Sequence, residues 1–248
     1  MVRDDAGGTG YEGVTVVQPS SNPGRLAGLL YVLMGIPATF SLVYVPRTLI
    51  VRGDAAATSR NILASEMLFR TGIVAELVYL LVFLLLAMAL YRLLAGVNKT
   101  HASLMVSLVL ASVAIGFLNV LNEVAALTLF RGADFLSVFD RRQLDALGMF
   151  FLGLYGRGLN INEALWGLWL FPFGVLVIRS GLIPRILGVL LIVNCFAYLA
   201  ASLTALLLPA YSGLMHRVAL IPETGELWIM LWLLIKGARV QPLPAAAS

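Results

Sequence analysis

Six long runs of apolar residues set the strongest constraint on what this chain can fold into. A helix needs about 20 apolar residues to cross the hydrocarbon core of a membrane. Every backbone polar group in lipid must be hydrogen-bonded within the protein, and continuous runs of this length exclude the short alternating strands of a membrane β-barrel. The sequence therefore predicts an all-α integral membrane protein, a bundle of six transmembrane helices. The predicted spans cover residues 25–45, 70–94, 102–130, 157–178, 182–208 and 217–235.

Composition supports this prediction and excludes other classes of protein. Apolar residue types make up 60% of the chain and charged types 12%, which is about half the charged share of a soluble domain. The net charge of +4 is dispersed along the chain, so no nucleic acid is expected as a partner. The single cysteine, Cys195, excludes an intramolecular disulfide bond. Membrane lipids are the expected surroundings of the folded chain.

The chain is predicted to form one membrane domain, residues 23–239, between two tails. Residues 1–22 lack the basic start and apolar stretch of a signal peptide, so we expect a disordered N-terminal tail. Residues 240–248 are expected to form a C-terminal tail. Lys99 and Lys236, the only lysines, fall on the N-terminal side of the membrane, where the loops are short and free of acids. Because basic residues in short loops favour the cytoplasm, both termini are predicted to be cytoplasmic.

The two long connections between spans are predicted to be structured. They cover residues 46–69 and 131–156. Asp54 and Asp140 are each placed as the N-cap of a following amphipathic segment. We therefore expect two amphipathic helices, about 54–69 and 140–156, at the outer interface of the membrane. Long helices that protrude from the membrane are the alternative.

Three spans share one spacing of charged residues, with Arg six positions before Glu and a second Arg sixteen positions after it. The twenty-two residues between the arginines correspond to about 33 Å of helix, near the hydrocarbon thickness. The arginines are therefore expected to reach the two interfaces. Similar openings of the first and fifth spans, at Arg25 and Arg185, favour three helical hairpins in tandem. The three sets are Arg70, Glu76 and Arg92; Arg157, Glu163 and Arg179; Arg217, Glu223 and Arg239.

Five glutamates are predicted to lie at one depth in the outer half of the spans. They are Glu76, Glu123, Glu163, Glu223 and Glu226. A charged side chain in the hydrocarbon costs about 2.5–3.5 kcal/mol on insertion scales, so these residues are expected to face the bundle interior. Asn119 and Asn122 share a helix face with Glu123. The pattern predicts an outward-facing carboxylate chamber that binds a small cation or polar solute.

The sixth span contains a helix-breaking segment. Pro222 leaves the carbonyl group of Val218 without its helical donor, and Gly225 weakens the next turn. Glu223 and Glu226 are three residues apart and share one helix face. In a medium of low dielectric constant one of them is expected to hold a proton or a cation. We predict a kink or an opened turn at residues 218–225 that brings a free carbonyl group and a carboxyl group to one cavity. The cationic partners expected nearest to it are Arg70, Arg157 and Arg217.

Three functions are compatible with this pattern. In the first, the chamber binds its ligand in a sensing, binding or transport role. In the second, the Glu, Arg and Asn network only holds the bundle together as a scaffold. In the third, Glu223 and Glu226 are the acid–base pair of a lipid-modifying intramembrane enzyme. The inner halves of the spans lack acidic residues, which favours a binding or sensing role over a channel. The enzyme hypothesis ranks third, because the sequence offers no clear nucleophile or metal site beside Glu223 and Glu226.

The residue types present also limit the cofactors. The two histidines, His101 and His216, lie near span ends, so neither haem nor a zinc site of His and Cys ligands is expected. No glycine-rich phosphate loop occurs in the sequence, so no nucleotide is expected. Carboxylate and amide oxygens would suit Ca²⁺, Mg²⁺ or Mn²⁺ if a metal binds.

Several stretches of the chain resemble a bacterial multi-pass membrane family described as domain of unknown function 4386. They include Gly28-Leu-Leu-Tyr, Tyr44-Val-Pro, Asn61-Ile-Leu-Ala-Ser-Glu-Met-Leu-Phe-Arg70, Trp166-Gly-Leu-Trp-Leu-Phe-Pro and Leu182-Ile-Pro-Arg-Ile-Leu-Gly. The resemblance covers roughly residues 23–238, and residues 53–70 are its most specific part. It implies a helical bundle in the bacterial cytoplasmic (inner) membrane and brings no established activity, cofactor or catalytic residue.

Overall fold

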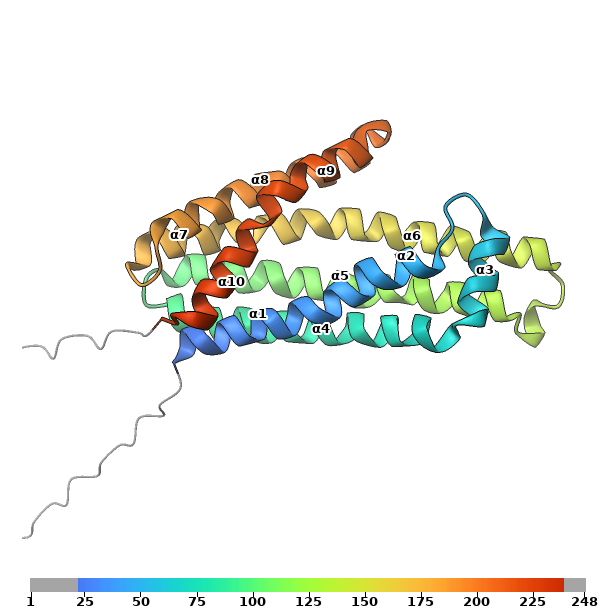
Figure 1. The fold of residues 1–248 in the computed structure, drawn as a ribbon, viewed down its shortest axis with the longest axis horizontal. Coiled ribbons are helices and arrows are strands. Elements are labelled where there is room, and N and C mark those ends of the chain that lie inside the picture. Colours follow the sequence, from blue (N-terminus) through green and yellow to red (C-terminus); the bar gives the residue numbers. More distant parts are fainter. Residues whose placement is uncertain (1–21, 239–248) are drawn as a thin grey trace, which may run out of the picture.

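The computed structural model describes residues 22–238, apart from the side chain of Glu223. Within this range it contains helices joined by short turns, and six helices are long and apolar enough to cross a membrane (Figure 1). The protein is thus an all-α multi-pass membrane protein, as the sequence predicts. The six spans are Pro23–Leu49, Glu66–Leu94, Lys99–Arg131, Arg141–Ser180, Arg185–Leu207 and Pro209–Ile235.

Three of the spans are single α-helices and three are interrupted. The single helices are α4 (Glu66–Leu94), α5 (Lys99–Arg131) and α8 (Arg185–Leu207). The first span comprises α1 (Pro23–Thr39), the π-helical turn η1 (Phe40–Tyr44) and α2 (Val45–Leu49). The fourth comprises α6 (Arg141–Leu168) and α7 (Leu170–Ser180), and the sixth comprises η3 (Pro209–Tyr211), α9 (Ser212–Glu223) and α10 (Gly225–Ile235).

Each interruption lies close to a proline. Pro37 precedes η1, Pro172 follows the break at Trp169, and Pro222 precedes the break at Thr224. Proline has no backbone N–H and its ring displaces the carbonyl group four residues earlier, so the regular helical hydrogen bonds fail at these points. The predicted kink in the sixth span is confirmed, because α9 ends at Glu223 and α10 begins at Gly225.

One of the two long connections contains a separate short helix, whereas the other leads into a single long helix. Asp54 caps helix α3 (Ala55–Ala64) by accepting a hydrogen bond of 2.8 Å from the backbone N–H of Ala57. Asp140 caps α6 in a reciprocal pair with Gln143. Both predicted N-caps are therefore confirmed. Residues 140–156 do not form a separate interfacial helix, because α6 continues without a break to Leu168. The continuous helix agrees with the alternative of one long helix, and its position relative to the membrane stays a prediction.

The spans form a closed ring of neighbours. Helix α1 packs on α4, α4 on α5, α5 on α6, and both α6 and α7 pack on α8. Helix α10 closes the ring by packing on α1 and α8. Successive spans are thus adjacent as three hairpins, whereas the internal repeat of the hairpins stays a prediction.

The two ends of the described chain meet at one end of the bundle. The backbone N–H of Gly24 donates to the carbonyl oxygen of Ala238 at 3.0 Å, and the N–H of Ala238 donates to Asn22 Oδ1 at 3.0 Å. The short connections 95–98 and 181–184 lie at this same end, and the long connections with α3 lie at the opposite end (Figure 1). The end with α3 is called the α3 end below.

Helices α7 and α8 cross with their backbones in close contact. A Cβ atom built on Gly174 would lie 2.7 Å from the carbonyl oxygen of Gly188, and a Cβ on Gly188 would lie 2.7 Å from that of Gly174. Real Cβ atoms do not approach backbone oxygens this closely, so both positions require glycine. Small residues at a crossing allow such approach in membrane bundles, where van der Waals packing drives helix association.

The substitution Gly188→Ala should therefore destabilise the protein. Overpacking of a tight site costs about 1–3 kcal/mol, which thermal unfolding in detergent would detect as a lower melting temperature. Gly153→Ala in α6 is the matched control, because a Cβ there meets nothing within 4 Å and alanine is the better helix former. Equal melting temperatures for the two variants would contradict the close crossing.

Candidate functional site

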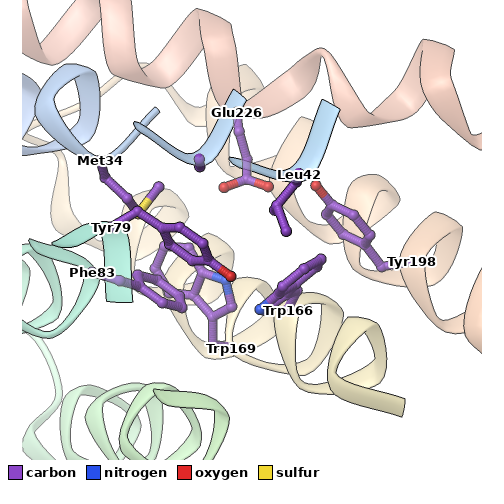
Figure 2. Close-up of a pocket in the computed structure, with 9 residues that line it drawn as sticks. Met34, Leu42, Tyr79, Phe83, Trp166, Trp169, Tyr198 and Glu226 are labelled. Carbon is purple, nitrogen blue, oxygen red and sulfur yellow. The ribbon is translucent and has the colours of Figure 1, made fainter. Parts of the chain in front are cut away.

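A cavity of about 170 Å³ lies inside the ring and is lined by every span except α5. We call it the central cavity. Aromatic side chains form most of its wall, and one carboxylate reaches it from α10 (Figure 2). The lining residues are Met34, Ala38, Leu42, Tyr79, Phe83, Trp166, Trp169, Tyr198 and Glu226.

The wall of the central cavity is built around Trp169. The Trp169 ring stacks on Phe173 with centroids 5.4 Å apart and meets Phe83 edge-on at 5.2 Å. Tyr31 approaches Trp169 from α1 at 6.4 Å. Offset and edge-to-face contacts of this kind hold aromatic rings in defined orientations. The break between α6 and α7 falls at Trp169 itself, so an irregular backbone places the central ring of the cluster.

Glu226 is held at the edge of the central cavity by side chains from two other helices. It accepts a hydrogen bond of 2.8 Å from the Tyr31 hydroxyl group and one of 3.3 Å from Asn194 Nδ2. Figure 2 shows its carboxylate pointing toward the aromatic wall. Glu226 occupies the first turn of α10, just after the break that follows Pro222.

A second polar group joins α4, α5 and α6. Glu76 and Glu123 are buried, with 1% and 6% of their surfaces exposed, and their carboxyl groups interact electrostatically. The Tyr155 hydroxyl group donates to Glu76 Oε2. Tyr79 interacts electrostatically with both glutamates and also lines the central cavity, so it lies between the two regions.

Two asparagines stabilise this second group. Asn119 Nδ2 donates to the backbone oxygen of Tyr155 at 2.9 Å, and Asn122 Nδ2 donates to the backbone oxygen of Asn119 at 3.1 Å. The predicted cluster of Asn119, Asn122 and Glu123 on one face of α5 therefore serves at least in part to connect α5 with α6.

A third polar group joins α6 and α9. Glu163 is 8% exposed, and its Oε2 atom lies 3.4 Å from His216 Nε2. His216 Nδ1 lies 2.8 Å from the backbone oxygen of Ser212, one helical turn earlier. The imidazole is therefore held between a carboxylate and a carbonyl group, both of which are acceptors.

The structure distributes the predicted site residues over these three groups. The partners described here for Glu76, Glu163 and Glu226 are tyrosine, asparagine and histidine side chains on other helices. Of the glutamate side chains that the structure describes, Glu226 lines the central cavity. The Glu223 side chain and Arg239 lie outside the described residues.

The three predicted arginines lie apart from these contacts. Arg70 forms an ion pair of 2.7 Å with Glu66 at the α3 end. Arg157 is exposed on α6, and Arg217 is exposed on α9, where its Nε donates to the Gly213 carbonyl oxygen at 3.1 Å. Among the described side chains, which leave out Glu223, no three His, Cys, Asp or Glu residues cluster in a way that could hold a metal ion.

Sequence reasoning missed the partners of the glutamates. Asn194 is an amide within an apolar run, which is a visible signal for a buried polar contact. Tyr31 and Tyr155 carry no such signal, because tyrosine is common in membrane helices and its partner depends on which helix lies opposite. These contacts become evident from the packing of the spans.

Fold and site together define a multi-pass helical membrane protein with an aromatic cavity and buried carboxyl groups. The profile of the family described as Domain of unknown function (DUF4386) matches residues 26–237, and the chain belongs to this family. It is also 29% identical over 154 residues to an uncharacterized protein of Archaeoglobus fulgidus, a match that covers 62% of this chain and 76% of the relative. No solved structure matches the chain.

The bond from Tyr155 to Glu76 can be tested by removing the hydroxyl group. Tyr155→Phe leaves a buried carboxyl group without its donor, which should lower the free energy of unfolding by about 1–3 kcal/mol. Tyr211→Phe is the control, because Tyr211 is 61% exposed. Denaturant unfolding in detergent micelles measures both. A loss for Tyr155→Phe no larger than that of the control would show that the bond contributes nothing to stability.

Proposed function

We propose that this protein binds a small organic cation, of the alkylammonium class, in the central cavity. The observation that carries the proposal is the Glu226 carboxylate, which points into a cavity walled by aromatic rings. Aromatic faces attract ammonium groups electrostatically, by about 2 kcal/mol or more where the cation is desolvated. A carboxylate beside such faces adds the opposite charge that a buried cation needs.

Size and placement support the same ligand class. A cavity of about 150 Å³ in another protein holds benzene, and the central cavity is about 170 Å³. A ligand of four to seven heavy atoms, on the order of benzene's size, therefore fits. An organic ammonium also needs fewer directional ligands than a metal ion, so one carboxylate beside aromatic rings is enough to bind it.

A structural role is the second candidate, because Glu226 bridges three helices. Its contacts with Tyr31 and Asn194 connect α10 to α1 and α8. Interhelical hydrogen bonds of this kind contribute about 0.6 kcal/mol on average in membrane bundles. The two roles predict different results for one substitution, since a scaffold does not respond to an added cation.

Removing the charge of Glu226 distinguishes the cation-binding role from the structural role. We expect choline to raise the melting temperature of the detergent-solubilised protein, and 3,3-dimethylbutanol, its neutral isostere, to leave it unchanged. Glu226→Gln keeps the size of the side chain and removes the charge, so the affinity for choline should fall on the order of tenfold or more. Isothermal titration calorimetry measures this change.

The matched control is Glu66→Gln. Glu66 is an acid at the α3 end, where it pairs with Arg70 and Arg131. This variant should bind choline as the parent does. A lower melting temperature for Glu226→Gln, without a choline effect in the parent, would favour the scaffold. A response to Ca²⁺ in place of choline would overturn the organic-cation assignment.

We further propose that the protein resides in a bacterial cytoplasmic membrane with both termini on the cytoplasmic side. The meeting of Gly24 with Ala238 at one end supports a common side for the termini. Lys99 and Arg185, at the starts of the helices that follow the short connections, support a cytoplasmic face at that end, because basic residues in short loops favour the cytoplasm.

The orientation of the protein in the membrane can be determined by labelling introduced cysteines, because Cys195, the single native cysteine, is buried. Thr100→Cys places a thiol group near a short connection, and Ser137→Cys places one in the long connection after α5. A membrane-impermeant maleimide should label the Ser137→Cys variant in intact cells and the Thr100→Cys variant only after lysis. The reverse pattern would invert the proposed orientation.

A further inference from the structure

A second hollow, of about 860 Å³, lies between the end of the first span and α9. Arg47 from α2 and Arg52 from the following turn line one side, and His216 and Arg217 from α9 line the other. Asn160 of α6 also lines it. We call this hollow the basic groove. Figure 1 shows that α9, packed on α8, inclines away from α6 and the first span toward its Ser212 end.

Among the described side chains, those that line the basic groove and carry a permanent charge are arginines. Among the described side chains, which leave out Glu223, no carboxylate forms an ion pair with Arg47, Arg52 or Arg217. Glu163 lies beside His216 at 3.4 Å and is directed to the imidazole. Three guanidinium groups from elements far apart in the sequence thus face one hollow, and guanidinium groups bind phosphate oxygens through paired hydrogen bonds.

An apolar groove of about 480 Å³ lies between the first span and α10. Ile36, Phe40 and Tyr44 line it from the first span, and Leu227 and Met230 line it from α10. Tyr44, which lines the apolar groove, lies three residues before Arg47, which lines the basic groove. The two grooves therefore reach the first span within about one helical turn of each other.

We infer that the basic groove binds the phosphate headgroup of an anionic phospholipid, whose acyl chain lies in the apolar groove. The charge selects an anionic head, and the apolar groove selects a lipid over a soluble phosphate. Ordinary arginines at a membrane interface reach the headgroup layer one by one. Here the end of the first span and α9 present their arginines to the same space, which favours one bound lipid. Leu42 lines both this groove and the central cavity, but the inference does not depend on the function proposed for the cavity.

Native mass spectrometry of the detergent-solubilised protein tests the inference. Phosphatidylglycerol and phosphatidylcholine with identical acyl chains are added in parallel, and the binding of the first lipid is measured. We expect phosphatidylglycerol to bind at least fivefold more tightly. A basic residue near an anionic lipid surface contributes about fivefold in affinity, so Arg47→Gln combined with Arg217→Gln should weaken phosphatidylglycerol binding at least tenfold.

Two further variants keep the test informative. Arg142→Gln is the matched control, since Arg142 is an exposed arginine at the start of α6 that does not line the groove. It should bind phosphatidylglycerol as the parent does. Arg52→Gln changes an exposed turn residue and should weaken binding about fivefold, even if the double variant proves unstable.

Three results would overturn the inference. The first is equal affinity of the parent for the two lipids. The second is equal behaviour of Arg142→Gln and the groove variants. The third is displacement of phosphatidylglycerol by inorganic phosphate at millimolar concentration, which would assign the groove to a soluble phosphate. Glu226→Gln should retain phosphatidylglycerol binding, which separates this inference from the proposal for the central cavity.

Discussion

The cost of placing a carboxylate in lipid governs how this bundle is assembled. An acidic side chain in the hydrocarbon costs several kcal/mol unless it finds a partner inside the protein. Glu76, Glu163 and Glu226 each meet a polar group from another helix: Tyr155, His216, and Tyr31 with Asn194. These contacts specify which helices become neighbours, because apolar packing alone distinguishes poorly among lipid-facing surfaces. The order of helices around the ring therefore follows its polar contacts as well as its apolar faces.

The interrupted helices position side chains that line the central cavity. Prolines within a span are tolerated where the disturbed backbone is buried in protein or lines a cavity. Pro172 accompanies the break that sets Trp169 into the aromatic cluster, and Pro222 accompanies the break that starts α10 next to Glu226. Both breaks border the central cavity.

The features that the sequence predicted well are those that depend on local chemistry. Asp54 and Asp140 cap helices because an acceptor side chain before a helix satisfies its free N–H groups, and neither contact needs a distant partner. The break after Pro222 follows in the same way from the missing donor of proline. Segment 140–156 was harder to place, because an amphipathic pattern does not distinguish a helix lying on the membrane from the end of a helix that protrudes from it.

The sequence by itself determined that the chain crosses the membrane six times, since apolar length and backbone hydrogen bonding leave no other stable arrangement. It also determined that Glu76, Glu123 and Glu163 are buried, because lipid does not solvate a carboxylate. Only the tertiary structure decided that these acids belong to different polar groups and that Glu226 lines a cavity walled by aromatic rings. The physical reason is that the residues sharing a helix face follow from the sequence of one segment. The residue that contacts an acidic side chain from another helix depends instead on how the two helices are rotated and how they cross. Those quantities result from packing among all six spans, as the contact between Gly174 and Gly188 illustrates.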